Sequence, residues 1–151
     1  MPAAVSRILL AISLLAVVGM ALSAVSLKNH YSGDKTEYCD LGETFNCDLV
    51  NRSVYSHVGP VPVAAIGLIG YAALFALSRM RRRSAAALML LGSLAGLAFA
   101  LRLTYIEAYV LGVWCLLCLS SLGTIVATTA LSGVALVRAS TSTDRNQQQL
   151  S

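Results

Sequence analysis

The sequence predicts an all-α integral membrane protein, a bundle of four transmembrane helices with an extracytoplasmic cap loop. Of its 151 residues, 57% are apolar and only 12% are charged, about half the charge of an average soluble domain. Four apolar runs are each long enough to cross a ~30 Å hydrocarbon core, which takes about 20 helical residues. Seven of the eleven basic residues lie in three short segments beside these runs, where positive charge fixes topology.

The four predicted helices belong to one domain, residues 1–151, and cover about residues 8–27, 61–78, 84–105 and 110–137. The first run contains no charge, and its 20 residues exceed the 7–15 of a signal-peptide core. Its length therefore favours a spanning helix, although Ala21 and Ser23 resemble a cleavage site. Pro60 and Pro62 precede the second run, and proline is tolerated in the first turn of a helix.

The segments between and after the runs are polar. Residues 28–60 form the predicted cap loop, in which Cys47, Val50 and Val54 recur at helical spacing and predict a short helix on the membrane surface. Glu107 lies in the short turn between the third and fourth runs, and a polar tail covers residues 138–151. We expect this tail to fray.

Basic residues in short loops predict the orientation. They stand at three places: before the first run, after the second and after the fourth, as Arg7, Arg79, Arg81, Arg82, Arg83, Arg138 and Arg145. These ends are expected in the cytoplasm, with the cap loop outside, in a multi-pass protein of the cytoplasmic (inner) membrane. Because topology explains the basic residues, the net charge of +4 predicts no nucleic-acid partner; the bilayer is the expected surrounding.

All four cysteines fall on the predicted extracytoplasmic side, where disulfides are permitted. Cys39 and Cys47 lie in the cap loop, and Cys115 and Cys118 lie in the opening turns of the fourth predicted helix. The second pair is about one helical turn apart, close enough to form and break a disulfide with little backbone movement. A helix N-terminus also favours the reactive thiolate. Two such pairs suggest a relay by thiol–disulfide exchange.

Other interpretations of the cysteines remain open. Two static structural disulfides would also explain the even number, as would a zinc site of four cysteines. A site divided between a loop and a membrane helix suits tetrahedral zinc poorly, so no metal is expected. Histidine is the side chain best suited to proton transfer at physiological pH, so His57, near the junction of loop and helix, is a candidate proton carrier, although such a residue is more often a solvated loop histidine.

Two motifs carry a resemblance to the vitamin K epoxide reductase family. Cys39-Asp40-Leu41-Gly42, followed after four residues by Cys47, resembles the loop signature of that family. Val50, Ser53, Tyr55, Ser56 and the Gly59-Pro60-x-Pro62 segment resemble its bacterial members, and Trp114-Cys115-x-x-Cys118 matches its active-site motif. The resemblance covers about residues 1–136, including the number of helices and the order of the cysteines.

The resemblance implies a membrane thiol:quinone oxidoreductase that supports disulfide bond formation. Electrons would pass from a thioredoxin-fold partner to Cys39 and Cys47, then to Cys115 and Cys118, and then to a quinone such as menaquinone or ubiquinone. The residues implied around the quinone pocket are Cys118, Ser53, Trp114, Val63 and Leu122. Many bacterial relatives carry a fused thioredoxin-like domain, and this chain ends at Ser151 without one, so a separate extracytoplasmic partner is expected.

Two alternative functions remain. The animal enzymes hold the substrate oxygens with an asparagine and a tyrosine, at positions that align with Val63 and Leu122 here. Reduction of a quinone epoxide by the same relay is therefore a second choice to reduction of a quinone. A non-enzymatic membrane subunit with structural disulfides is the rival from another class. It has no need for a Cys-x-x-Cys pair inside a helix.

Overall fold

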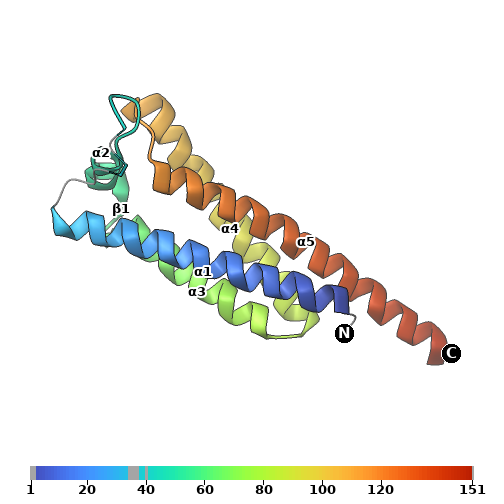
Figure 1. Cartoon of the computed structure of the whole chain (residues 1–151). Coiled ribbons are helices and arrows are strands. Elements are labelled where there is room, and N and C mark those ends of the chain that lie inside the picture. Colours follow the sequence, from blue (N-terminus) through green and yellow to red (C-terminus); the bar gives the residue numbers. More distant parts are fainter. Residues whose placement is uncertain (1–2, 34–37, 40, 151) are drawn as a thin grey trace.

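The computed structural model describes residues 3–33, 38–39 and 41–150, with the backbone alone for residues 142–147, 149 and 150. Asp40 of the loop motif and the outermost residues of the predicted domain, 1, 2 and 151, lie outside the described residues. Four long helices lie side by side along one direction (Figure 1). They are α1 (Ala3–Ser32), α3 (Val63–Arg79), α4 (Arg83–Ile106) and α5 (Leu116–Leu150).

The helices are those of an all-α membrane protein. In the described part of the chain, three segments are long and apolar enough to cross a membrane: Ala3–Ser32, Arg83–Leu111 and Leu116–Thr141. Helix α3 is also apolar, but at 17 residues it rises only about 25 Å, slightly less than the hydrocarbon core. That α3 spans the membrane as a fourth crossing stays a prediction.

The boundary between the last two helices differs from the sequence prediction. A fourth helix was expected over residues 110–137, but α4 continues as a π-helical turn, η2 (Glu107–Leu111), and α5 begins only at Leu116. Gly112 separates them with a φ of 66°, a left-handed conformation that suits glycine and ends helices. At the other end α5 is helical through the polar tail to Leu150, where fraying was expected.

Small and polar residues bring the helices together in the core. The Tyr71 ring of α3 packs directly on Gly19 of α1, and the Tyr71 hydroxyl donates to the Ser121 carbonyl of α5 at 3.0 Å. The hydroxyls of Ser13 and Ser78 join α1 to α3 at 2.8 Å. Close packing at small residues and hydrogen bonds between helices are the main associating forces in a membrane. The outward faces are apolar and exposed, as lipid contact requires; examples are Leu14, Ile69, Leu91 and Val137.

A compact cap follows α1 at one end of the bundle. It contains the helix α2 (Cys47–Arg52), the 3-10 turn η1 (Val54–Ser56) and a hairpin of β1 (His57–Val58) and β2 (Val61–Pro62), paired as His57 with Pro62 and Val58 with Val61. The short helix predicted after Cys47 is therefore present, although Val54 already belongs to the next turn. Both termini lie at the opposite end of the bundle (Figure 1). The cap is thus held well away from the chain ends.

Candidate redox site

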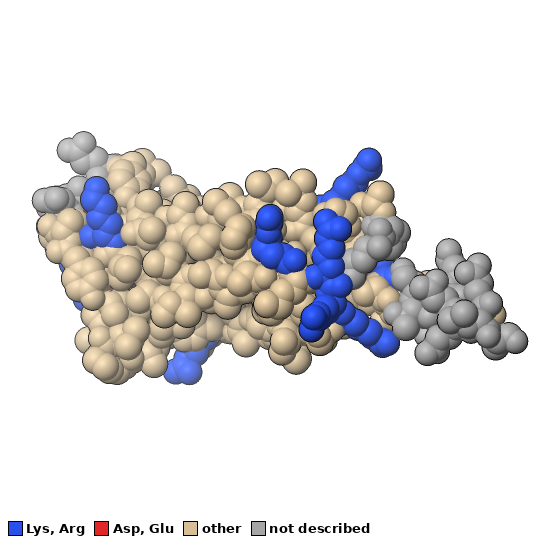
Figure 2. Space-filling model, turned by 90° about the horizontal axis from the view of Figure 1, so that it is seen from below, with Lys and Arg blue, Asp and Glu red and all other residues tan. Residues whose placement is uncertain are grey.

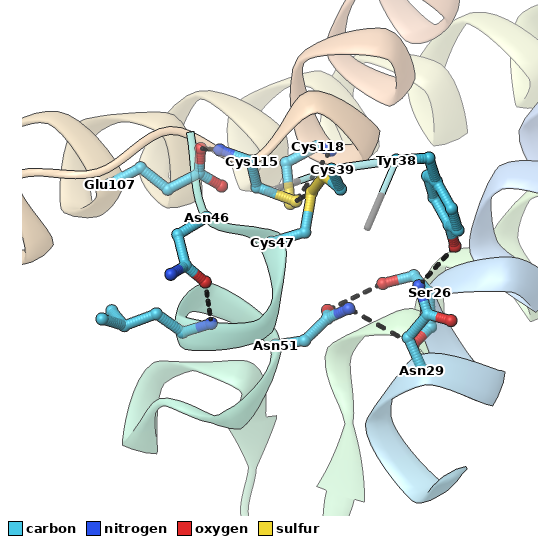
Figure 3. The surroundings of a disulfide bond; sticks show 11 residues. Ser26, Asn29, Tyr38, Cys39, Asn46, Cys47, Asn51, Glu107, Cys115 and Cys118 are labelled. Atoms are coloured by element: carbon cyan, nitrogen blue, oxygen red, sulfur yellow. Dashed lines mark hydrogen bonds between the residues drawn. A yellow bond between two sulfur atoms is a disulfide. The ribbon is translucent and has the colours of Figure 1, made fainter. Parts of the chain in front are cut away.

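The four cysteines converge where the cap meets the start of α5 (Figure 3). Cys39 and Cys47 form a disulfide with their Cα atoms 5.7 Å apart, while Cys115 and Cys118 are free thiols. The Sγ of Cys115 lies 3.3 Å from the Sγ of Cys47. Cys39, Cys47 and Cys115 are fully buried, and Cys118 is half-buried. One thiol is therefore in contact with a disulfide, as thiol–disulfide exchange requires.

Backbone pairing sets this contact. Phe45 and Trp114 form a parallel bridge, in which the Trp114 N–H donates to the Thr44 carbonyl at 2.9 Å and the Asn46 N–H donates to the Trp114 carbonyl at 3.0 Å. Cys47 and Cys115 follow directly after the bridged segments. The pairing thus aligns the cap cysteine with the first cysteine of the Cys-x-x-Cys motif.

Helix α2, which begins at Cys47, connects the cap to α1. The Asn46 side chain caps α2 by accepting from the Leu49 N–H at 2.9 Å. On the far side of α2, the buried Asn51 side chain accepts from the Ser26 hydroxyl at 2.8 Å, and its backbone carbonyl accepts from the His30 ring at 2.6 Å. These bonds attach the cap to the last turns of α1, and the Phe45–Trp114 bridge attaches it to the segment before α5. The cap is therefore held to the bundle at two places.

The surroundings of Cys115 favour its thiolate. Its sulfur accepts from the backbone N–H of Cys118 at 3.4 Å, a donor in the first turn of α5 that the helix leaves unpaired. The hydrogen bond from the Cys118 thiol lowers the pKa of Cys115 below its ordinary value, although burial acts in the opposite direction. Cys115 lies just before α5 rather than inside it. It is therefore the better nucleophile of the pair, and it is the one that faces the disulfide.

Glu107 is a fifth member of the site that the sequence did not identify. Its side chain is 1% exposed, and its Oε2 accepts from the Cys115 N–H at 3.1 Å. The other oxygen, Oε1, has no hydrogen-bond partner among the described residues. A carboxylate oxygen and the Sγ atoms of Cys115 and Cys118 all lie within 4.8 Å of one another. The one available signal was an acidic residue eight positions before Cys115, in a turn expected to face water.

A cavity of about 450 Å³ opens beside Cys118 between the cap and helices α1, α3 and α4. Of the five residues predicted around a quinone, Ser53, Val63 and Cys118 line this cavity. Trp114 and Leu122 do not: Trp114 is bound to the cap through its backbone, and Leu122 packs against the bundle core. The sequence prediction missed other polar lining residues, among them His30, Asn51 and Glu107.

The cavity has the character of a site for an apolar ring with polar edges. Its wall is mostly aliphatic, with the Cys118 thiol and a few hydroxyl, amide and carboxyl groups, and its volume is within the ordinary range for small-molecule pockets. The site matches a structural zinc centre poorly. Two of the four cysteines are joined in the disulfide. Among the described residues, the remaining thiols and Glu107 offer three donors, whereas a closed zinc site uses four.

Comparison with known proteins identifies the family of the chain. No curated protein matches the chain. The model of the vitamin K epoxide reductase family matches residues 10–133, a range that includes the cap and all four cysteines. The matched range is most of the 151-residue chain, and the chain therefore belongs to the vitamin K epoxide reductase family, whose members are membrane thiol oxidoreductases.

Proposed function

We propose that the protein oxidises the dithiol of an extracytoplasmic thioredoxin-fold partner and passes the electrons to a membrane quinone, in support of disulfide bond formation. Cys39 exchanges with the partner, Cys47 exchanges with Cys115, and Cys118 transfers the electrons to the quinone. The overall reaction converts a dithiol and a quinone to a disulfide and a quinol. Both protons and both electrons of the dithiol are accounted for in the quinol.

The contact between Cys115 and the Cys39–Cys47 disulfide supports this relay most strongly. In the direction of oxidation, the Cys47 thiolate attacks Cys115 in a Cys115–Cys118 disulfide, which releases the Cys118 thiolate. The Cys39 thiolate then attacks Cys47 and releases Cys115. With the two protons that Cys39 and Cys47 lost on becoming thiolates, the products are a Cys39–Cys47 disulfide and two free thiols, the same pairing that the structure contains. The Sγ–Sγ separation of 3.3 Å between Cys47 and Cys115 is short enough for this exchange.

The cavity supports a quinone as the electron acceptor. A quinone ring is apolar with two carbonyl oxygens, and the aliphatic wall beside Cys118 offers it contact area and polar groups. When bound, the quinone supplies a two-electron acceptor next to the Cys118 sulfur. Menaquinone and ubiquinone share these properties. Cys115 then attacks Cys118 as the electrons leave, and the inner disulfide is restored.

The charge pattern supports an extracytoplasmic redox site in the cytoplasmic membrane. More Lys and Arg side chains lie toward one end of the bundle than toward the cap (Figure 2). This is the end at which the α3–α4 turn and both termini lie (Figure 1). Basic residues in short loops remain in the cytoplasm, and the cysteines lie at the other end. In this orientation the cap meets oxidisable protein thiols where disulfides persist.

A Cys118→Ser variant tests the relay. Starting from reduced Cys115 and the Cys39–Cys47 disulfide, attack on Cys47 yields a mixed Cys47–Cys115 disulfide. Serine cannot resolve this bridge at Cys115, so only the reverse attack of Cys39 on Cys47 can break it. Alkylation of the free Cys39 thiol blocks that reversal. We therefore expect a Cys47–Cys115 bridge in protein purified without reductant and alkylated, as detected by mass spectrometry of non-reduced peptides.

The matched control is Cys118→Ser combined with Cys47→Ala, which should show no bridge to Cys115. A non-enzymatic subunit with structural disulfides would behave differently. In the Cys118→Ser variant it would keep the Cys39–Cys47 disulfide and leave Cys115 as a free thiol. That result would refute the relay.

A further inference from the structure

Glu107 lies beside the reactive thiols and contributes to the wall of the cavity. It extends from η2, the π-helical turn before Gly112, and points toward Cys115 (Figure 3). Oε2 is held by the Cys115 N–H, and Oε1 is buried with no hydrogen-bond partner among the described residues. Leaving a buried polar atom unpaired costs free energy. Glu107 also has a carboxylate oxygen within 4.8 Å of both inner sulfurs and contributes to the cavity wall, so its burial at this place requires a functional explanation.

The chemistry of the inner cysteine pair needs a proton carrier at this place. When two thiols become a disulfide, two electrons and two protons leave the sulfur atoms. Cys115 is fully buried, and Cys118 lies on the wall of the cavity, so an acceptor that fills the cavity separates both thiols from water. The thiolate is the reacting species. A base must accordingly remove the proton from Cys118 before its sulfur can react.

We propose that Glu107 is this base: its carboxylate takes the proton from the Cys118 thiol and returns it to an oxygen of the electron acceptor in the cavity. This inference rests on the proposed thiol:quinone oxidoreductase function. The S–H bond of Cys118 breaks as an O–H bond forms on Glu107, and the O–H bond breaks again as the quinol is completed. The Cys115 thiol supplies the second proton of the quinol. Glu107 ends each turnover as the carboxylate that began it.

The other titratable side chains on the cavity wall suit the task less well. The His30 ring donates its Nδ1 proton to the Asn51 carbonyl, and the Tyr71 hydroxyl is paired with Ser121. Tyr55 is 43% exposed, at the cap rather than beside Cys118. His57, a candidate from the sequence, lies exposed in β1, where its ring contacts His30. Glu107 is the titratable group whose carboxylate lies within 4.8 Å of both sulfurs.

A Glu107→Gln variant separates proton transfer from positioning. The glutamine oxygen can still accept from the Cys115 N–H, but the amide cannot take a proton. We expect single-turnover reduction of a soluble ubiquinone analogue by the reduced variant to slow by about 100-fold, within the range of general acid–base catalysis. The rate of this variant should also keep rising with pH, because Cys118 must lose its proton to solvent before the acceptor fills the cavity. The wild-type rate should instead reach a plateau once Glu107 is ionised. A Glu107→Asp variant should recover a substantial part of the rate and show the same kind of plateau.

A further measurement completes the test. Exchange between Cys47 and Cys115, followed by peptide mass spectrometry without quinone, should still take place in Glu107→Gln. Loss of the internal exchange in that variant, or a wild-type rate and pH profile in the variant, would overturn the proposal. Failure of the wild type to reduce quinone would instead refute the proposed function.

Discussion

At the scale of single residues, Cys115 and Cys118 differ although they share one motif. Cys115 precedes α5 and faces the outer disulfide, whereas Cys118 lies inside the first turn and on the cavity wall. The hydrogen bond that Cys118 gives to Cys115 lowers the pKa of Cys115. The Cys118 thiol thus stabilises the thiolate of Cys115.

Removal of that hydrogen bond should have a measurable effect. A lowered pKa keeps the Cys115 thiolate populated down to a lower pH, so a Cys118→Ala variant should form the thiolate only at a higher pH than the wild type does. Alanine keeps the N–H that donates to the Cys115 sulfur and should not disturb the helix. Thiolate ultraviolet absorbance, titrated with the outer disulfide intact, would measure the shift. A first thiolate titration that is unchanged in the variant would show that the Cys118 thiol does not tune Cys115.

The same residues show what the sequence could and could not predict at the site. The cysteines were recognisable because Cys-x-x-Cys spacing has a chemical meaning that does not depend on the fold. Glu107 was not, because a carboxylate in a polar turn is ordinarily solvated, and only the extra residue of a π-helical turn directs it toward the cysteines. Asn51 was missed for a related reason: its role depends on a hydrogen bond to Ser26, 25 positions away.

At the scale of elements, the contact of α1 with α3 depends on the absence of a side chain. A Cβ at residue 19 would collide with the ring of Tyr71, which also holds α5 through Ser121. The absence of a side chain at Gly19 therefore sets the distance between α1 and α3 and leaves Tyr71 in place to bind α5. Small residues at helix crossings have this effect in membrane bundles.

Gly19→Ala should accordingly destabilise the bundle. Insertion of a methyl group into a packed core costs about 1–3 kcal/mol, so the free energy of unfolding in detergent should fall by roughly this amount. Gly133→Ala in α5 is the matched control, because nothing lies within 4 Å of a Cβ at that position and alanine favours the helix by up to about 1 kcal/mol. Equal stability of the two variants would contradict the role assigned to the Gly19–Tyr71 contact.

The elements also explain why the predicted helix over residues 110–137 started too early. Val110, Leu111 and Val113 continue the apolar pattern across the break, so hydropathy alone gives no boundary. The break depends on the positive φ of Gly112 and on pairing of Trp114 with the cap. Because that pairing joins segments nearly 70 positions apart, local sequence cannot reveal it. The short helix α2 was predictable, since its spacing is local.

At the scale of the whole molecule, charge and sulfur chemistry are separated along the bundle axis. The larger group of Lys and Arg side chains lies at the end of the bundle that holds the two termini (Figures 1 and 2). The cysteines lie at the other end, where the cap meets α5. Cys39 and Cys47 are fully buried, so an exposed cap position is the suitable probe. This separation predicts that a membrane-impermeant thiol reagent, applied to intact cells, labels Val54→Cys, at an 83% exposed position of the cap, in a chain whose four native cysteines are replaced by alanine.

A cysteine at the basic end provides the control. Ser84→Cys, exposed near the start of α4, should be labelled only after the membrane has been opened, in a chain whose four native cysteines are replaced by alanine. The reverse pattern, with residue 54 protected and residue 84 accessible, would show that the orientation is inverted.

The backbone bridge between Phe45 and Trp114 has a kinetic consequence. Two sulfurs held 3.3 Å apart react as parts of one molecule, and even a flexible tether gives an effective concentration of about millimolar, which fixed orientation raises further. The internal exchange is therefore first order and keeps its rate however dilute the protein is in the bilayer. Encounters with the outside dithiol and with the acceptor are second order. At low abundance, the supply of these two reactants limits turnover.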